Sequence, residues 1–199
     1  MSEQAPIYMV SGWVRHGTSM MMHALETGGL DAAYSVQGDQ RGQRRWNDGA
    51  YNPNSDGFYE LDPQDYRSSN FPAAYRGRLI KCLRGGVLRL PPDCGPYRIV
   101  YMRRDGEETR QSMQALFSQD IPPDRAQVIE RETALMSGIL HQRADCDVTV
   151  VWYRDVIEDP LAQFQRVADA GWPIDARVAA ETVKPELCRF RKELLDEGV

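Results

Sequence analysis

The sequence predicts an α/β fold in which helices flank a central, mostly parallel sheet in three layers. Three observations predict it: short apolar runs recur along the chain, helical periodicity fills the segments between them, and the two kinds of segment alternate. The chain has 199 residues, of which 42% are hydrophobic, so we expect one domain over residues 1–199. In such folds, ligands bind at the carboxyl ends of the strands.

Four apolar runs are typical of strands that are buried on both faces. They cover residues 7–10, 79–83, 99–102 and 148–153. Because helical segments separate several of them, we expect these strands to be parallel.

The first helix is expected to begin at Gly17 and to end before Gly28, where two glycines stop it. The second is expected to begin at Asp105. Glu108 follows three residues later, which is the spacing of a capping box.

The third helix is expected over residues 124–141. Its apolar periodicity predicts a stripe on the core side, with two further apolar residues beside it. The stripe consists of Val128, Leu135 and Ile139, and the neighbours are Met136 and Leu140. Two more helices are expected, one after each of two prolines: Pro160 and Pro185.

The net charge is −5 and the isoelectric point is about 5.3. This balance provides no general attraction to nucleic acid or to an anionic membrane, so we expect neither as a partner. An anionic ligand would have to be held by local arginines. No feature of the sequence indicates an oligomeric state.

The four cysteines lie far apart, at Cys82, Cys94, Cys146 and Cys188. They form no CxxC pair and have no histidine at ligand spacing, so we expect no metal site. No apolar stretch approaches the ~18 residues of a membrane span, and the first residues lack the basic segment of a signal peptide. We therefore expect a reduced, cytoplasmic location.

Residues 36–63 form a long stretch without sustained periodicity, rich in Gly, Asn, Asp and Arg. A loop of this length in a small domain is usually functional or disordered. Its aromatic residues favour the first option, because solvated linkers rarely carry so many. They are Trp46, Tyr51, Phe58 and Tyr59. We expect this stretch to form an acceptor-site or lid loop.

The turn after the first expected strand has the spacing of a phosphate-binding loop, Gly12-x4-Gly17-Thr18-Ser19. Backbone N–H groups converge in such a turn, and the following helix adds partial positive charge. The alternative is a turn that only reverses the chain. The order of strand, turn, hydroxyl pair and helix favours an anion site and a P-loop-like fold.

Loops that bind ATP carry a lysine where this chain has Thr18, and here the cation stands at Arg15. Residues 14–19 resemble the 5'-phosphosulfate loop of the sulfotransferases, Pro-(Arg/Lys)-Ser-Gly-Thr-(Thr/Ser). Val14 and His16 stand where that pattern has proline and serine. The resemblance implies a set of ligands for the 5'-phosphosulfate: Arg15, His16, Gly17, Thr18 and Ser19.

A second motif of that family, Arg-x7-Ser, is matched by Arg104 and Ser112 in "RIVYMRRDGEETRQSM". Arg104 leaves a strand at its carboxyl end and Ser112 lies in the second turn of the next helix, so both can meet one phosphate. Arg103 points to the opposite face. A solvated, charged helix start is the alternative. The resemblance implies that the pair binds the 3'-phosphate of the adenosine cofactor.

Two later segments are similar to bacterial sulfotransferases. Residues 151–160 resemble their late strand, which is followed by a Tyr-Glu-Asp-Leu-type turn. Residues 183–191 resemble a basic segment that closes over the cofactor. The resemblance implies three further cofactor ligands: Lys184, Arg189 and Arg191.

The resemblance implies transfer of a sulfuryl group from 3'-phosphoadenosine 5'-phosphosulfate to a hydroxyl or amine of a small acceptor, without a metal ion. Such a transfer depends on alignment and on electrostatic stabilisation. Arg15 would face the sulfuryl group and the leaving phosphate. A general base must take the proton of the acceptor.

The stretch "NPNSDGFYE" resembles a bacterial segment that ends in a catalytic carboxylate, which implies Glu60 as the base. Cytosolic sulfotransferases use a histidine two residues after a strand lysine; here Lys81 keeps the lysine and Leu83 replaces the histidine. Lys81 would stabilise charge or extend into solvent. His16 is the competitor, as a base or, when protonated, as a clamp on the anion. The other histidines are expected to be structural or solvated: His23 and His141.

Two other functions stay open from the residues. A P-loop kinase for a small metabolite shares the fold and the turn, but this loop lacks the lysine, and the strand "YMRRD" carries arginines where magnesium needs carboxylates. A member that binds the nucleotide without turnover is the second. The acceptor itself is not indicated by the sequence.

Overall fold

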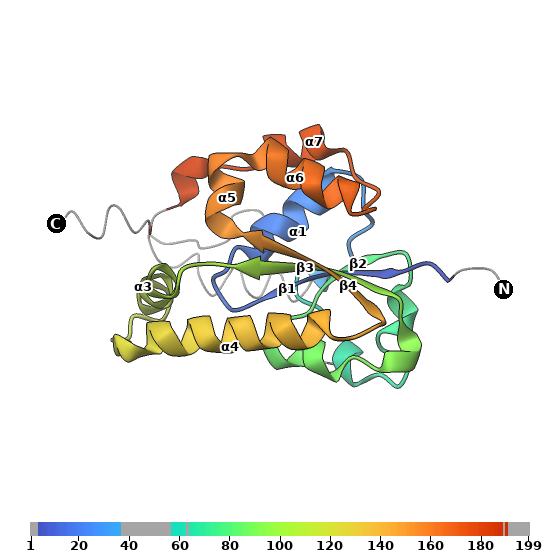
Figure 1. Cartoon of the computed structure of the whole chain (residues 1–199), viewed down its shortest axis with the longest axis horizontal. Helices are drawn as coiled ribbons and strands as arrows, with labels where there is room; N and C mark the ends of the chain where they lie inside the picture. The colour runs from blue at the N-terminus through green and yellow to red at the C-terminus, as the bar shows by residue number, and fades with distance from the viewer. Residues whose placement is uncertain (1–3, 37–56, 63, 189, 191–199) are drawn as a thin grey trace.

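A four-stranded parallel sheet forms the centre of the computed structural model, which describes residues 4–36, 57–62, 64–188 and 190 (Figure 1). The strands are β1 (Ile7–Gly12), β2 (Leu79–Lys81), β3 (Tyr97–Arg103) and β4 (Cys146–Trp152). They lie in the order β2-β1-β3-β4, and every pairing is parallel. The four expected strands and the α/β fold class are thus confirmed. The expected burial on both faces is wrong for β4, which lies at an edge of the sheet and has one buried residue, Val151.

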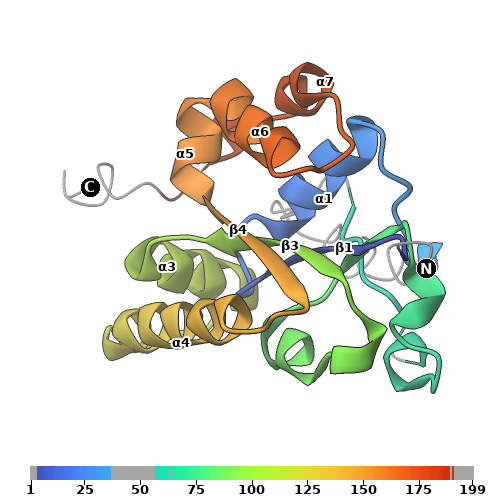
Figure 2. The ribbon, with the colours of Figure 1, turned by 45° about the vertical axis from the view of Figure 1, so that its right-hand side comes forward.

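Helices cover both faces of the sheet, so the fold has the three expected layers (Figure 1). One face carries α1 (Thr18–Thr27), α5 (Tyr153–Glu158), α6 (Pro160–Asp169) and α7 (Ala176–Glu181). The other face carries α3 (Gly106–Phe117) and α4 (Asp124–His141). Figure 2 shows the two helical layers on opposite sides of the twisted sheet.

Short 3-10 turns also occur between these elements and near the C-terminus. They are η1 (Asp65–Arg67), η2 (Ala73–Tyr75), η3 (Arg84–Arg89), η4 (Pro92–Cys94) and η5 (Pro185–Leu187). The helix expected after Pro185 is therefore wrong within the described residues, where a single 3-10 turn follows this proline. The helices α5 and α7 were not predicted, because each is only six residues long.

The core is divided by the sheet into two clusters. Tyr8 and Val10 of β1 pack toward α1 and the helices α5 to α7, and Ile7 and Met9 pack toward α4. All six residues of β1 are buried, as expected for a central strand of a parallel sheet. The two methionines that begin the apolar face of α1, Met21 and Met22, are fully buried.

The face of α4 that meets the sheet differs from the predicted stripe. Leu135 and Ile139 are 62% and 38% exposed. The buried face instead runs through Ile129, Thr133, Met136, Ser137 and Leu140. The predicted neighbours Met136 and Leu140 are therefore on the buried face, and the predicted stripe is wrong because it left out the buried polar residues Thr133 and Ser137. The Thr133 hydroxyl donates to the Ile129 carbonyl oxygen over 2.6 Å, so this polar residue is satisfied inside the helix and can be buried.

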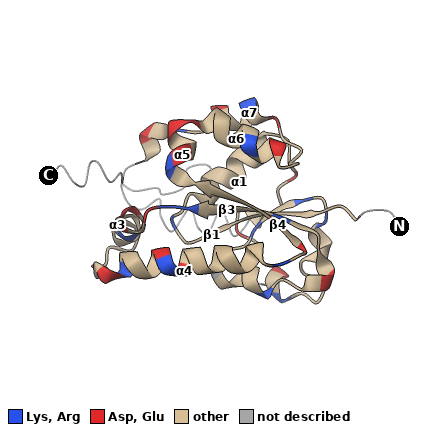
Figure 3. Cartoon of the chain, viewed as in Figure 1, with Lys and Arg blue, Asp and Glu red and all other residues tan. Residues whose placement is uncertain are grey.

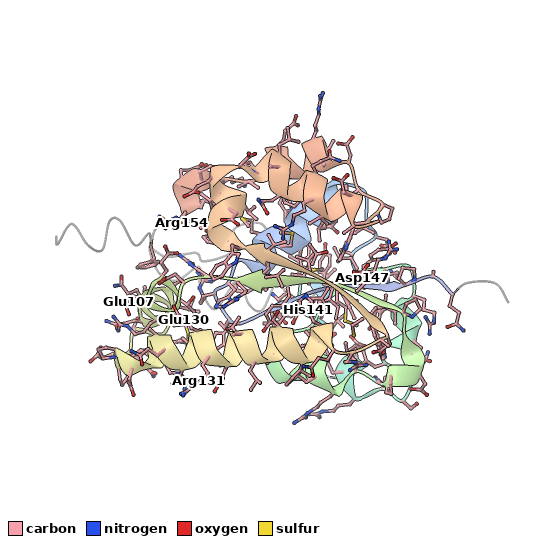
Figure 4. The ribbon with its side chains drawn as sticks, viewed as in Figure 1. Glu107, Glu130, Arg131, His141, Asp147 and Arg154 are labelled. Atoms are coloured by element: carbon pink, nitrogen blue, oxygen red, sulfur yellow. The ribbon has the colours of Figure 1, made fainter. Side chains whose placement is uncertain are left out.

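The start of α3 is fixed by its cap and by α4. The Asp105 carboxylate accepts from the backbone N–H groups of Glu107 and Glu108 over 2.8 and 3.1 Å, which confirms Asp105 as the N-cap. The Gly106 N–H donates to Glu130 Oε1 over 3.0 Å. Glu130 is labelled on α4 in Figure 4, on the side of that helix toward α3. These bonds set the direction in which α3 leaves β3.

Charged side chains are distributed over the described part of the fold. Figure 3 shows residues of both signs on both helical layers. Within the part of the chain that the structure describes, no helix has the length and apolarity that crossing a membrane requires. In the same residues, no three His, Cys, Asp or Glu side chains gather as a metal site. The four cysteines form no disulfide.

The difference in burial between Leu140 and Leu135 of α4 predicts different effects of the same substitution on stability. Replacing the fully buried Leu140 by alanine should lower the free energy of unfolding by about 2–5 kcal/mol, because it leaves a cavity. The same change at the exposed Leu135 should alter it by less than about 0.5 kcal/mol. Urea unfolding of both variants measures the difference, and a larger loss at Leu135 would contradict the helix orientation.

Candidate functional site

The turn after β1 lies at the carboxyl edge of the sheet and passes twice through left-handed backbone. Arg15 has φ 71° and Gly17 has φ 82°. The His16 N–H donates to the Trp13 carbonyl oxygen over 3.2 Å and closes the turn. Gly17 then caps α1, whose first N–H groups have no partner within the helix. The structure thus forms the predicted loop, with its amides at a helix N-terminus.

Two glycines of this turn cannot carry a side chain without moving its neighbours. Gly12 has φ 149°, and a Cβ there would lie 2.8 Å from the Met102 carbonyl oxygen of β3. A Cβ at Gly17 would overlap the Tyr153 ring at the start of α5. The loop therefore packs directly on β3 and on α5.

Arg15 joins the two sequence motifs. Its Nε donates to Ser112 Oγ over 3.0 Å, although the two residues are 97 positions apart in the sequence. Ser112 is 1% exposed and lies on α3. A hydroxyl that accepts from a guanidinium keeps its own hydrogen for donation to an anion. The predicted 5'-phosphosulfate and 3'-phosphate ligands therefore form one continuous cluster.

Arg104 is buried at the back of this cluster and holds three elements together. Its Nε pairs with Glu108 Oε2 over 3.0 Å, and its two terminal nitrogens donate to the carbonyl oxygens of Arg15 and Phe190 over 3.2 and 2.7 Å. Its guanidinium also lies over the Tyr153 ring, 4.5 Å from the centroid. Arginine has five N–H groups, so these bonds leave two. That Arg104 and Ser112 share a phosphate stays a prediction.

The neighbouring Arg103 points to the other face of the sheet, as predicted. Its guanidinium lies over the Trp152 ring, 4.4 Å from the centroid, and the two residues are paired in the register of β3 and β4. Consecutive arginines thus stack on consecutive aromatic residues, and only Arg104 is directed to the loop.

His16 is neutral and enclosed. It is fully buried, and its Nδ1 lies 3.1 Å from the Met102 carbonyl oxygen, which can only accept, so Nδ1 carries the hydrogen. Burial, together with the positive charges of Arg104 and Arg103, lowers the pKa of His16 to about 4, although the hydrogen bond to the Met102 carbonyl oxygen raises it. In the fold without a bound anion His16 is therefore neutral near neutral pH, and the protonated clamp on a bound phosphosulfate stays a prediction. Nε2 is a buried acceptor without a partner among the described residues.

Lys81, at the end of β2, is a second buried cation of the site, after Arg104. Its side chain is 3% exposed, so it does not extend into solvent. Its Nζ lies 2.7 Å from Glu60 Oε1 and donates to Ser19 Oγ over 3.2 Å and to the Phe58 carbonyl oxygen. The structure therefore brings Glu60, Lys81 and the hydroxyl end of the loop together.

Thr18 is 5% exposed, and its methyl group lies beside Gly12, where a Cβ would approach it to 3.3 Å. Lys184 is exposed, directly before η5. Arg189 and Arg191 lie outside the described residues. The same C-terminal segment reaches the site through the Phe190 carbonyl oxygen, and Cys188 is close enough to Tyr153 to help raise the pKa of that phenol.

Of the expected acceptor loop, residues 37–56 and 63 lie outside the described part, including Trp46 and Tyr51. Residues 57–62 lie beside β2 and α1, and the Ser35 N–H donates to the Glu60 carbonyl oxygen over 2.8 Å. His141 is at the end of α4, where its Nδ1 lies 2.8 Å from the Ser137 carbonyl oxygen (Figure 4).

Three contributors to the site were missed. Tyr153 supports both the loop and Arg104, Glu108 neutralises Arg104, and Tyr59 anchors the segment that carries Glu60. Burial raises the pKa of Tyr153 above its ordinary value, so it stays neutral. An aromatic residue at the end of an expected strand was a usable signal for Tyr153. The i,i+4 spacing of Arg104 and Glu108 was a usable signal for Glu108. The contacts of Tyr59 with α1 are not shown by sequence spacing.

No protein-family model and no curated protein matches the chain. Among solved structures, it is similar to a sulfotransferase domain from the curacin biosynthetic pathway, with 16% identity and a TM-score of 0.47, over 94% of this chain and 77% of that one. It is also similar to a sugar kinase from Janibacter sp. HTCC2649, with 14% identity and a TM-score of 0.43, over 87% and 98% of the two chains. Likeness at this level does not extend to function.

The neutral His16 predicts a pH dependence of stability. Its pKa is about 4 in the fold and 6.5 in the unfolded chain, so between these values the unfolded state binds more protons and stability falls as the pH falls. The free energy of unfolding should lose about 1 kcal/mol per pH unit in this window through His16. His16→Asn should remove that part of the slope in urea unfolding, and an unchanged slope would contradict the assignment.

Proposed function

We propose that this chain is a sulfotransferase, which moves a sulfuryl group from 3'-phosphoadenosine 5'-phosphosulfate to a hydroxyl or amine of a small acceptor. The observation that carries the proposal is the 3.0 Å hydrogen bond from Arg15 to Ser112. It brings the two motifs that resemble the sulfotransferase signature into one cluster, and a donor with phosphates at both ends needs such a cluster.

The residues fit a doubly phosphorylated adenosine. The amides before α1, with Thr18 and Ser19, suit the 5'-phosphate, and Ser112 with the remaining N–H groups of Arg104 suits the 3'-phosphate. Arg15 lies between these groups, where it can stabilise charge on the leaving phosphate. The bound nucleotide would supply the activated sulfuryl group. Metal ions are not part of the proposal.

Glu60 is the residue that we assign as the general base. It is 42% exposed, so an acceptor can reach it, whereas His16 is fully buried. Lys81 Nζ, 2.7 Å from the carboxylate and 3.2 Å from Ser19 Oγ, connects the base to the loop and places a fixed cation beside it. This cation can stabilise negative charge that develops during transfer.

The contacts of Lys81 also argue against a kinase. In P-loop kinases, the hydroxyl at the position of Ser19 binds magnesium. Here that hydroxyl accepts from the Lys81 ammonium over 3.2 Å, so a cation of this chain already lies beside it. Asp105, the carboxylate after β3, is used as the N-cap of α3. Both observations favour a donor that does not require magnesium.

We further propose that the acceptor is a small molecule and that the protein works in the reducing cytoplasm. The four cysteines are free thiols, which is usual for proteins in a reducing compartment. The acidic net charge supports the exclusion of nucleic acid and anionic lipid as partners.

Titration with adenosine 3',5'-bisphosphate in the presence of a chelator tests the proposal. Binding should need no magnesium, and Ser112→Ala should weaken it about tenfold to a hundredfold through the lost hydrogen bond to a charged group. Arg78→Ala, which removes an exposed pair with Asp31 away from the loop, is the control and should bind normally. Binding of ATP that depends on magnesium, with no binding of the bisphosphate, would favour the kinase.

Turnover of Glu60→Gln tests the base, with labelled donor and a screen of hydroxylated acceptors. The rate should fall about 10²–10⁴-fold, the usual contribution of a general base. Affinity for the bisphosphate should stay within a factor of about two, because Glu60 contacts Lys81 and not the predicted phosphate ligands. If His16→Asn abolishes turnover while Glu60→Gln does not, the base is His16. Tight bisphosphate binding without turnover of any acceptor would indicate a non-catalytic nucleotide-binding protein.

A further inference from the structure

Tyr59 has an unfavourable backbone conformation beside the group around Lys81. Its φ is 59°, in the left-handed region, while its side chain is 3% exposed. For an aromatic residue this conformation is an outlier, and it persists only where surrounding contacts impose it. Arg15, in the loop, is another non-glycine residue with positive φ. Contacts of the Tyr59 side chain or of its neighbours must therefore hold this backbone conformation.

The Tyr59 side chain is bound to one face of α1. Its hydroxyl donates to Glu26 Oε2 over 2.9 Å and lies 3.0 Å from His23 Nδ1. A phenol has one hydrogen, so His23 must donate the second bond. His23 and Glu26 are three residues apart and so lie on the same helix face. The Tyr59 ring also meets Tyr34 edge-on, with centroids 4.9 Å apart. We name Glu26, Tyr59 and His23 the tyrosine clamp.

The residues on both sides of Tyr59 are directed to Lys81. The Phe58 carbonyl oxygen accepts from Lys81 Nζ, and Glu60 Oε1 lies 2.7 Å from the same nitrogen. The left-handed turn at Tyr59 thus lets two neighbouring residues reach one ammonium while the ring between them packs on α1. The Ser35 N–H holds the Glu60 carbonyl oxygen over 2.8 Å.

We propose that Tyr59 is a positioning residue for Glu60: the clamp holds the backbone turn that keeps the Glu60 carboxylate at Lys81. This inference rests on the proposed role of Glu60 as general base. The hydroxyl carries the function, because a phenylalanine would keep the ring and its contact with Tyr34 but would lose both bonds to α1. Glu26 and His23 act on Glu60 only through Tyr59.

Tyr59→Phe tests the inference. We expect kcat to fall about tenfold to a hundredfold through misplacement of Glu60, while KM for the donor and the affinity for adenosine 3',5'-bisphosphate stay unchanged. The amide of Ser35, which reports attachment of residue 60, should exchange its hydrogen at least about tenfold faster. A kcat within about twofold of the parent, with unchanged exchange at Ser35, would overturn the inference.

Tyr97→Phe is the matched control. It removes another buried tyrosine hydroxyl, which donates to the Pro91 carbonyl oxygen over 2.7 Å in a different part of the fold. It should lower stability without changing kcat. If Tyr97→Phe and Tyr59→Phe lower stability equally and leave kcat equally unchanged, Tyr59 has only a structural role.

A second variant separates this inference from the proposed function. His23→Ala removes one of the two bonds of the Tyr59 hydroxyl and should lower kcat by no more than Tyr59→Phe does. The double variant with Tyr59→Phe should be no worse than Tyr59→Phe alone, because Tyr59→Phe already removes the bond to His23. If the parent protein transfers no sulfuryl group to any acceptor, the proposed function fails. Hydrogen exchange at the Ser35 amide then tests by itself whether the tyrosine clamp holds residue 60. Faster exchange in Tyr59→Phe then supports the clamp, and unchanged exchange rejects it.

Discussion

The hydrogen bond between Arg15 and Ser112 is the interaction on which the site depends. A parallel sheet brings the ends of β1 and β3 to the same edge, but it does not by itself make the turn after β1 contact α3. Arg15 has left-handed backbone, and its guanidinium contacts Ser112. Arg104 donates a hydrogen bond to the Arg15 carbonyl oxygen. Strained backbone that is fixed by several contacts is typical of functional sites.

Positive charge at this edge is divided into two groups with different partners. Arg104 is neutralised by the buried Glu108, and Lys81 is paired with the half-exposed Glu60. A buried cation without a partner would be costly, so these carboxylates make it possible to keep arginine and lysine inside. His16 lies between the loop and β3 as a neutral ring, and so adds no charge that would need a partner. The buried cations at this edge are thus held in place by carboxylates rather than by solvent.

Much of the fold and part of the site were predictable because they depend on local patterns. Apolar runs predicted all four strands, and α4 was predicted to begin at Asp124 and to end at about His141, as it does. The buried face of α4 was not, because Thr133 is satisfied by its own helix. The loop and the separation of Arg104 from Ser112 were readable from spacing. The bonds of Arg15 to Ser112 and of Tyr59 to α1 join residues far apart in the sequence, so spacing could not show them. Arg104 and Glu108 stand at the i,i+4 spacing of an ion pair, so that bond was open to prediction and was missed.

The most direct measurement is a crystal structure of the protein with adenosine 3',5'-bisphosphate. Our account predicts one molecule whose 5'-phosphate lies on the amides of residues 17–19 and whose 3'-phosphate lies within hydrogen-bond distance of Ser112 Oγ, with Glu60 still near Lys81. A bisphosphate bound elsewhere, or one that contacts the loop while its 3'-phosphate points away from α3, would contradict the account.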